Sequence, residues 1–273
     1  MLKSRALFVS AAALMVAAGL AMAQPEKREG GGRGRGQESS APAQDFPKSM
    51  PVPAEMASKG TVYYAISGKE RQITLHSDAP VEQIDGYSSN VVGYAIAGPK
   101  DNPAKLVGGE WHLPVASIDT GNRMRNKHLT EAGWLDAAKY ENIVFKLTEV
   151  KDVAPAKEPK ENTQAFTATL VGEMTMHGVT KPMTITDATI AFRKGDDTTK
   201  KMVDGDLMSL SCKYTIKLGD FGVQNKVVGQ KVAENIELTT TLVHSTVEPK
   251  AGKPAEKPAK DEKKSDAKPP AGS

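Results

Sequence analysis

The run Ser209–Leu218, which reads SLSCKYTIKL, decides the fold class of this 273-residue chain. Its apolar side chains occupy every second position, and Ser, Lys and Thr fill the positions between them. Successive side chains of a β-strand point to opposite faces, so this pattern predicts a strand with one buried and one solvated face. The apolar members are Leu210, Cys212, Tyr214, Ile216 and Leu218.

The same period of two recurs along the chain. Strong examples lie in 107–115, 143–147, 166–176 and 236–242, and weaker ones in 61–66, 71–77, 81–87, 91–97 and 183–193. One-sided alternation over so many strands is typical of an antiparallel sheet with one apolar face. Such a sheet either stacks as a sandwich or closes into a barrel, and closure removes the exposed edges. The alternation alone leaves both arrangements open.

One stretch interrupts the alternation. Residues 121–140 contain few β-branched side chains and predict one or two short helical turns over the rim of the sheet. Asn122 is the predicted N-cap, because its side chain can accept hydrogen bonds from the first free N–H groups of a helix. Asp119 is predicted to bind local N–H groups in a turn rather than to act as a general base.

The N-terminal residues predict export. Lys3 and Arg5 precede an apolar run rich in Ala and Leu, and Ala21-Met22-Ala23 matches a small-x-small cleavage site. We therefore expect residues 1–23 to be a signal peptide and the protein to be periplasmic or secreted. An exported chain with the single cysteine Cys212 forms no internal disulfide, so its stability must come from a core.

Residues 24–58 and 249–273 differ in composition from the segment between them. They are poor in large apolar residues, so we expect a disordered Gly/Arg/Pro-rich linker and a disordered Lys/Pro/Ala-rich tail. The intervening domain, 59–248, holds 22 basic and 24 acidic side chains. This balance lacks the positive surface of a nucleic-acid reader, and no nucleic-acid partner is expected.

Four sequence blocks carry a family resemblance. Residues 117–129 read SIDTGNRMRNKHL, 140–145 read YENIVF, 172–182 read GEMTMHGVTKP and 220–223 read DFGV. In this order and spacing they resemble the YceI-like family of exported lipid-binding barrels. The resemblance implies an all-β, eight-stranded antiparallel lipocalin-like barrel with a short helical segment at the rim. It also implies a cavity that holds a polyisoprenoid or similar long-chain lipid, and a barrel of about eight strands is wide enough for one small ligand.

The chain departs from the family pattern at three places. Near its first strand the family usually carries an Asp followed by a His-Ser pair, and residues 66–71 read ISGKER here. Asn126 stands where the family has an acidic residue, and Glu141 follows Tyr140 where the family prefers Pro. We expect the first two changes to alter polar contacts and the fold to be retained.

The inward apolar side chains are the candidate ligand site. We expect about half of them to be ordinary core, because ligand-binding barrels also close one end with packed side chains. The eleven methionines of the chain are flexible and suit an adaptable wall. The predicted ligand-binding residues are Leu113, Phe145, Phe166, Leu170, Met174, Phe192, Tyr214, Ile216, Leu238 and Leu242.

Basic residues are expected at the rim. Arg123, Arg125 and His128 are candidate contacts for a phosphate or quinone head group, and the alternative is a solvated helix face. His177 begins a Gly-containing turn and is predicted to make a structural hydrogen bond, since no second ligand lies at metal spacing. Cys212 is predicted to be an inert buried thiol. No metal site and no cofactor are expected.

The leading hypothesis is a non-catalytic carrier or sequestering protein for an isoprenoid or similar lipid. The sequence contains no GxSxG, HExxH, P-loop or Rossmann motif. Two alternatives stay open: a lipid-modifying enzyme that uses the basic rim with His128 or His177, and a structural envelope-interaction module that acts through its tails. Peripheral contact of the C-terminal tail with a membrane or cell wall stays open too, as does a homodimer.

Overall fold

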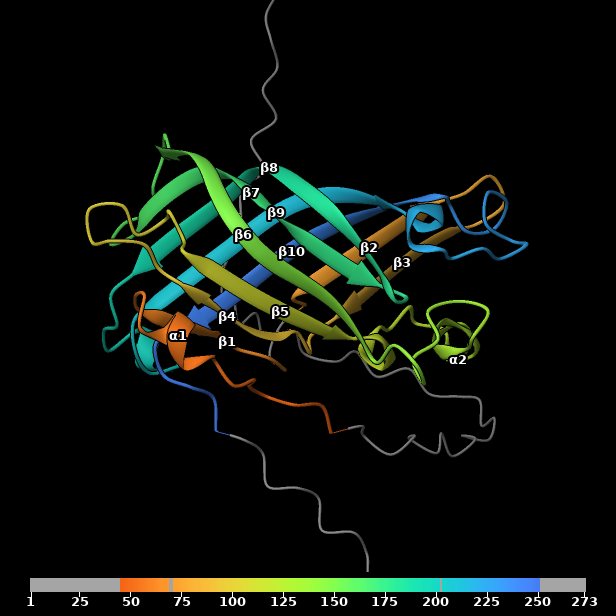
Figure 1. Cartoon of the computed structure of the whole chain (residues 1–273), viewed down its shortest axis with the longest axis horizontal. Coiled ribbons are helices and arrows are strands. Elements are labelled where there is room, and N and C mark those ends of the chain that lie inside the picture. Colours follow the sequence, from red (N-terminus) through yellow and green to blue (C-terminus); the bar gives the residue numbers. More distant parts are fainter. Residues whose placement is uncertain (1–44, 69–70, 202, 251–273) are drawn as a thin grey trace, which may run out of the picture. The chain divides into compact units, whose positions relative to one another are not determined.

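The computed structural model describes residues 45–68, 71–201 and 203–250 (Figure 1). The strands there are β1 Val62–Ala65, β2 Ile73–Asp78, β3 Gln83–Ser88, β4 Val92–Ile96, β5 Gly108–Pro114, β6 Asn142–Pro155, β7 Gln164–Met176, β8 Val179–Arg193, β9 Leu207–Lys217 and β10 Asn235–Ser245. The helices are α1 Ala54–Ala57 and α2 Arg123–Thr130, with the short 3-10 turns η1 Val115–Ser117, η2 Thr199–Lys201 and η3 Leu218–Phe221.

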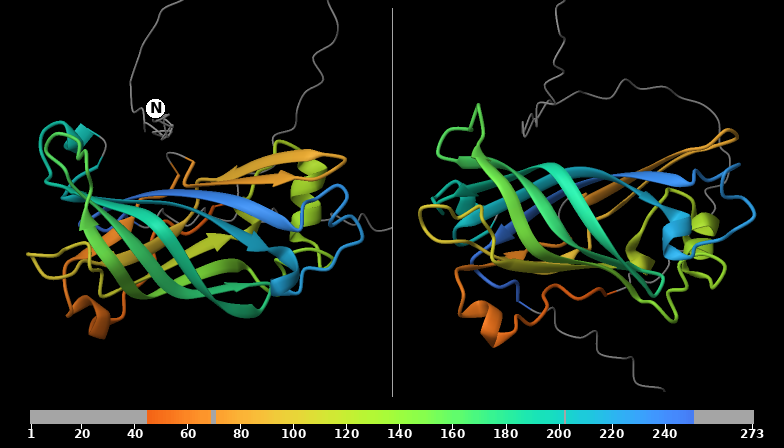
Figure 2. Two further views of the ribbon diagram at one scale, coloured as in Figure 1. Left: turned by 90° about the horizontal axis from the view of Figure 1, so that it is seen from above. Right: turned by 45° about the horizontal axis from the view of Figure 1, so that its top comes forward.

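The strands close into an antiparallel barrel. Hydrogen-bonded neighbours follow the order β1-β4-β5-β6-β7-β8-β9-β10, and β10 returns to β1 with Tyr64 opposite Ser245 and Ala65 opposite His244. These eight strands form the cylinder visible in Figures 1 and 2. The predicted eight-stranded antiparallel barrel is therefore confirmed, and the sandwich arrangement is not what the chain adopts.

The hairpin of β2 and β3 extends one side of the barrel. β2 pairs with the first half of β10 and β1 with its last two residues, so β1 and β2 follow the same edge of β10 as one interrupted strand. β3 and β4 in turn are the partners of β2 and β1. The hairpin thus lies at the end of the barrel where α2 lies, as the left view of Figure 2 shows.

The alternation seen in the sequence places the core inside the barrel. On β9, Leu210, Cys212 and Ile216 are buried, whereas Lys213 and Thr215 between them are exposed. The C-terminal part of β7 alternates in the same way. Removal of this apolar surface from water, at roughly 25 cal/mol per Å², is the main force that holds the cylinder together.

Bulges interrupt the register of the long strands. The pairing of β6 with β7 shifts between Leu147 and Glu149, and that of β7 with β8 shifts after Ala168. Asp152 and Asp187 have φ angles of 53° and 56° on the bulged strands. Because a bulge bends and twists its strand, these irregularities help to curl the sheet into a cylinder.

The described chain begins inside the segment predicted to be a disordered linker. α1 lies in this segment, and the methyl group of Met56 packs on Gly108 of β5, where a Cβ on the glycine would come within 2.2 Å of it. Through this apolar contact, α1 packs on the outside of the 59–248 segment.

Several predictions concern residues that lie outside the described part of the chain. These are the signal peptide 1–23, residues 24–44 of the linker and residues 251–273 of the tail. The longest of the described helices, α2, has eight residues. Within the described ranges, no helix combines the length and apolar composition needed to cross a bilayer.

Candidate functional site

A cavity of about 710 Å³ occupies the barrel interior. Inward side chains of β2, β5, β6, β7, β9 and β10 build most of its wall, and α2 borders its outer end. The wall is mainly apolar because alternate residues of each strand face the same side. The volume lies within the range of about 300–1,000 Å³ that is usual for small-molecule sites.

Eight of the ten predicted ligand-binding residues line this cavity. Phe145, Tyr214 and Leu238 are partly exposed although they point inward, so their exposed surface faces the cavity rather than bulk solvent. Contact of these side chains with a ligand stays a prediction. The eight are Leu113, Phe145, Leu170, Met174, Tyr214, Ile216, Leu238 and Leu242.

Phe166 and Phe192 lie outside the cavity lining and fill the other end of the barrel. Phe192 packs edge-to-face on Tyr63 with ring centroids 5.6 Å apart and on Phe166 at 6.5 Å. Met208, the cross-strand partner of Phe192, is fully buried, and the lining of β9 starts two residues later at Leu210. The prediction placed these two phenylalanines in the ligand site because alternation gives the face of a strand but not the depth along it.

A buried polar pair lies on the cavity wall near this closed end. Trp111 of β5 lines the cavity, and its indole Nε1–H donates to His244 Nε2 of β10 at 2.9 Å. His244 Nδ1 lies 3.3 Å from the Met208 carbonyl oxygen, so this nitrogen carries the proton of a neutral imidazole. Burial lowers the pKa of His244 to about 4, and the hydrogen bond to Met208 opposes that shift.

The helix α2 borders the open end of the cavity. Asn122 caps it as predicted, since its Oδ1 accepts from the N–H groups of Met124 at 3.0 Å and Arg125 at 3.1 Å. Met124 lines the cavity and is 63% exposed, so the cavity reaches the surface at this helix. The opening beside α2 is called the mouth below.

Asp119 and Asn126 fix the segment that leads into α2. Asp119 Oδ1 accepts from the Gly121 N–H and from Asn126 Nδ2, each at 2.8 Å, and Asn126 Oδ1 accepts from the Thr120 N–H at 2.9 Å. The hydrogen bond from Asn126, then that from Gly121, lowers the pKa of Asp119. The predicted turn role of Asp119 is confirmed, and Asn126 is its partner at the position where the family has an acidic residue.

The three predicted rim residues differ in position: Arg125 and His128 line the cavity, and Arg123 does not. Arg125 Nη1 pairs with Glu82 Oε1 at 2.9 Å, which ties α2 to the turn between β2 and β3, and both residues line the mouth. His128 also lines the cavity. Arg123 is exposed and lies outside the lining, because a short helix turns only part of its surface toward the opening.

Three neighbouring polar side chains interrupt the apolar surface of β9 and β10 on the cavity wall. Cys212 and Tyr214 lie on β9, and Thr240 lies beside them on β10. The Thr240 hydroxyl donates to Tyr214 Oη at 3.4 Å, and Thr240 lies opposite Cys212 in the register of the two strands. Burial raises the pKa of both Cys212 and Tyr214 to about 12, so both keep their protons at neutral pH. Burial of Cys212 agrees with its predicted character.

Other wall residues were not predicted from the sequence. Ile73 and Leu75 of β2 line the cavity, although their strand signal was among the weaker ones. Trp111 shares its strand face with a predicted residue, so the same alternation could have identified it. Val223 and Val232 line the cavity from an irregular loop, where no periodic signal exists.

His177 lies in the turn between β7 and β8 and outside the cavity lining. Its Nδ1 is 3.2 Å from the carbonyl oxygen of Phe221, and its ring packs edge-to-face on Tyr140 at 5.3 Å. The predicted structural hydrogen bond is therefore confirmed. Among the described residues, no group of three or more His, Cys, Asp or Glu side chains is placed to hold a metal ion.

The chain is similar in sequence to UPF0312 proteins of Pseudomonas species. A UPF0312 protein of Pseudomonas putida strain F1 is 33% identical over 112 residues, which are 41% of this chain and 50% of that protein. A UPF0312 protein of Pseudomonas fluorescens strain Pf-5 is 33% identical over 92 residues, 34% of this chain and 42% of that protein. The chain thus spans about half the length of the curated relatives it matches.

Solved structures and a family model cover most of the barrel. BcnA of Burkholderia cenocepacia has 18% identity and a TM-score of 0.44, over 69% of this chain and 97% of that one. A polyisoprenoid binding domain from Saccharophagus degradans has 9% identity and a TM-score of 0.45, over 68% and 99%. The family model described as the YceI-like domain matches residues 64–244, from β1 into β10. The chain belongs to the YceI-like family.

Proposed function

We propose that this protein is an exported, non-catalytic carrier or sequestering protein that holds a long-chain isoprenoid or similar amphipathic lipid inside the barrel. The observation that carries the proposal is the cavity of about 710 Å³, which has a mainly apolar wall and opens beside α2. An unfilled apolar cavity lacks the contacts of a packed core, and an apolar chain supplies those contacts.

Burial of hydrocarbon accounts for the affinity. Each methylene group that moves from water into the cavity contributes about 0.8 kcal/mol. A segment of about ten carbons therefore contributes about 8 kcal/mol before the entropic costs of binding are subtracted. This term is large enough to retain a long-chain ligand with few polar contacts.

The basic side chains at the mouth interact differently with charged and with neutral head groups. Arg125 and His128 border it, and Lys231 lines it from the loop before β10. A charged phosphate head group finds its hydrogen-bond donors here, where water still reaches it, and competes with Glu82 for Arg125. A neutral head group is not held at the mouth by charge.

The non-catalytic part of the proposal is supported by the state of the polar groups on the wall. On the inner wall, Cys212 and Tyr214 of β9 are a potential nucleophile and a potential acid or base, and burial raises the pKa of each to about 12. A thiol or phenol that keeps its proton is a poor nucleophile. Export is supported by the composition of residues 1–23.

Extraction of the natively purified full-length protein with organic solvent, followed by mass spectrometry, tests the proposal. Leu238→Trp places a larger side chain in the cavity, and Lys213→Trp makes the same bulky change on the outer face of β9. We expect the recovered lipid per mole of protein to fall severalfold in Leu238→Trp and to be unchanged in Lys213→Trp. Thermal melting should show that both variants are folded.

Two results would contradict the proposal. The first is a wild-type protein that yields no lipid and takes up no apolar fluorescent probe. The second is turnover of prenyl phosphates or quinols by the purified protein, if this activity is lost in a folded His128→Ala variant. That result would favour the alternative function, a lipid-modifying enzyme.

A further inference from the structure

Tyr214, Thr240 and Cys212 form one contiguous polar patch on the cavity wall. The register of β9 and β10 sets Thr240 opposite Cys212 and Leu238 opposite Tyr214, so Tyr214 and Thr240 are diagonal neighbours on the inner face. All three polar side chains line the cavity. The patch is thus a fixed feature of two long, fully paired strands.

Within this patch, the Tyr214 hydroxyl is the group whose proton remains free to donate a hydrogen bond. Thr240 Oγ1–H donates to Tyr214 Oη at 3.4 Å, which occupies an acceptor site of the phenol and leaves its own proton free to donate. Among the described residues, no hydrogen bond from the Tyr214 hydroxyl to an acceptor is present. A donor in apolar surroundings is costly to leave unpaired, and a hydroxyl that accepts a hydrogen bond becomes a stronger donor.

Other polar groups on the same wall already have partners. The Trp111 N–H donates to His244 at 2.9 Å. The Ser88 and Ser117 hydroxyls lie 2.7 Å apart, and Ser117 in turn donates to a backbone carbonyl. These groups serve the fold. Ser77, which accepts from the Ala233 N–H at 2.9 Å, is a further lining hydroxyl and lies on β2, near the turn that carries Glu82. The Tyr214 hydroxyl is the one in the middle of the β9 lining, and its proton is available to a ligand.

Tyr214 lies halfway along the cavity. The lining residues of β9 and η3 occur at every second position from Leu210 to Leu218, and Tyr214 is the middle one. At about 3.3 Å per residue, it is about 13 Å along the strand from Leu218. The basic lining residues, Arg125, His128 and Lys231, belong to the mouth. An anionic group beside Tyr214 would be buried without a counter-ion, which is strongly disfavoured.

We propose that the lipid held in this cavity carries an uncharged oxygen acceptor, such as a ketone or quinone carbonyl, an ether or an alcohol, which accepts a hydrogen bond from Tyr214 inside the barrel. This inference rests on the proposed function and names the ligand class for it. A pure hydrocarbon leaves the donor unpaired, and a lipid with an anionic head group keeps its charge at the mouth.

Competition with a neutral fluorescent probe, N-phenyl-1-naphthylamine, tests the inference on the delipidated full-length protein. The competitors are 2-heptadecanone and heptadecane, which share one chain length and differ in one carbonyl. Tyr214→Phe removes the donor. Tyr63→Phe removes the same atom from a buried tyrosine outside the cavity lining and is the matched control.

We expect Tyr214→Phe to weaken binding of the ketone by about threefold to tenfold, the effect of one hydrogen bond, and to leave binding of heptadecane unchanged. Tyr63→Phe should change neither. If wild-type protein binds both competitors and Tyr214→Phe changes neither affinity, the inference is overturned and the proposed function stands. If wild-type protein binds neither, the proposed function is overturned, and this inference with it.

Discussion

Single residues set the turn that joins β7 to β8. His177 and Gly178 have φ angles of 52° and 75°, the left-handed pair that a two-residue hairpin turn requires. A Cβ on Gly178 would also lie 2.4 Å from the Tyr140 ring. Glycine is therefore needed at this position for its backbone conformation and for the space it leaves.

Three glycine-to-alanine substitutions separate these two requirements. Gly219 has no positive φ, and a Cβ there would contact no neighbouring atom. Gly121 has a φ of 69°, but a Cβ there would lie in open space. We expect Gly121→Ala to lower the free energy of unfolding by about 1–2 kcal/mol, Gly178→Ala to lower it further, and Gly219→Ala to have little effect. Urea unfolding measures all three. Equal effects at Gly178 and Gly121 would show that the contact with Tyr140 is unimportant.

Local sequence predicted what these residues do but not what they touch. The Gly at 178 predicted a turn, and Asn122 was predicted as a helix cap because capping depends on adjacent N–H groups. The partner of His177, the Phe221 carbonyl, is 44 residues away along the chain. Such a contact depends on how the barrel closes, which no local pattern encodes.

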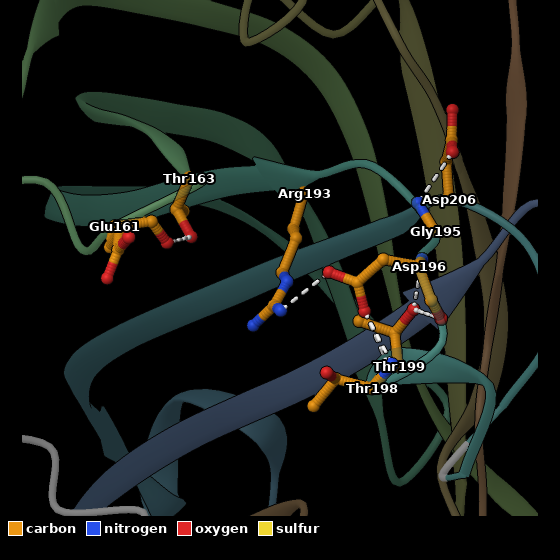
Figure 3. A network of polar contacts seen from close by, with 8 residues as sticks. All are labelled: Glu161, Thr163, Arg193, Gly195, Asp196, Thr198, Thr199 and Asp206. Atoms are coloured by element: carbon orange, nitrogen blue, oxygen red, sulfur yellow. Dashed lines mark hydrogen bonds and ion pairs between the residues drawn. The ribbon is translucent and has the colours of Figure 1, made fainter.

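The loop between β8 and β9 shows how one carboxylate organises a whole element (Figure 3). Asp196 Oδ1 accepts from the N–H groups of Thr198 and Thr199, each at 2.8 Å, and Oδ2 accepts from Arg193 Nη2 at 2.8 Å. Arg193, then the Thr199 N–H, lowers the pKa of Asp196 to about 2. The ionised carboxylate thus holds the end of β8 to η2.

This loop should respond to acid in a defined direction. The pKa of Asp196 is lower in the folded state than its usual 3.8, so its stabilising contribution is full above about pH 4 and is lost as the pH falls toward about 2. We expect Asp196→Asn to lower the urea midpoint at pH 6 and the difference from wild type to shrink by pH 2.5. Asp197→Asn, at the fully exposed neighbour, is the control and should have little effect. A constant difference across this range would contradict the assignment.

At the level of strands, alternation predicted which side chains face inward but not how deep they lie. Leu170 and Phe166 share a face of β7, yet Leu170 lines the cavity and Phe166 packs against Phe192 at the closed end. Depth depends on the tilt and stagger of all eight strands together. The loop that carries Val223 has no periodic pattern, so its contribution to the cavity wall was not predicted.

Closure of the barrel involves a short seam, which is the pairing of β1 with β10, and a hydrogen bond between side chains of β5 and β10 in the interior. β1 meets β10 in two residue pairs, a brief closure for a cylinder of this size. Trp111 of β5 donates to His244 of β10 at 2.9 Å, and these strands are separated around the barrel by β4 and β1. His244 is fully buried at the seam, so its protonation state bears on the closed cylinder as a unit.

Acidification should therefore weaken the barrel through His244. Burial lowers its pKa from 6.5 to about 4, so below about pH 6.5 the unfolded chain takes up a proton that the folded protein excludes. Stability falls as the pH drops from about 6.5 to about 4, by about 3 kcal/mol in total. His244→Gln should lower the free energy of unfolding at pH 7 through the altered bond to Trp111, and should flatten the pH dependence in this range. Urea unfolding at pH 7, 5.5 and 4.5 measures both effects.

The control for this prediction is His76, whose pKa is shifted in the opposite direction from that of His244. His76 is partly exposed on β2, and its hydrogen bond with Asp85 at 2.8 Å raises its pKa. Its contribution is therefore full at low pH and is lost as the pH rises, so His76→Gln should keep the acid sensitivity of the wild type or increase it. If wild type and His244→Gln lose stability in parallel between pH 7 and 4.5, His244 is not the group that links the closed barrel to pH.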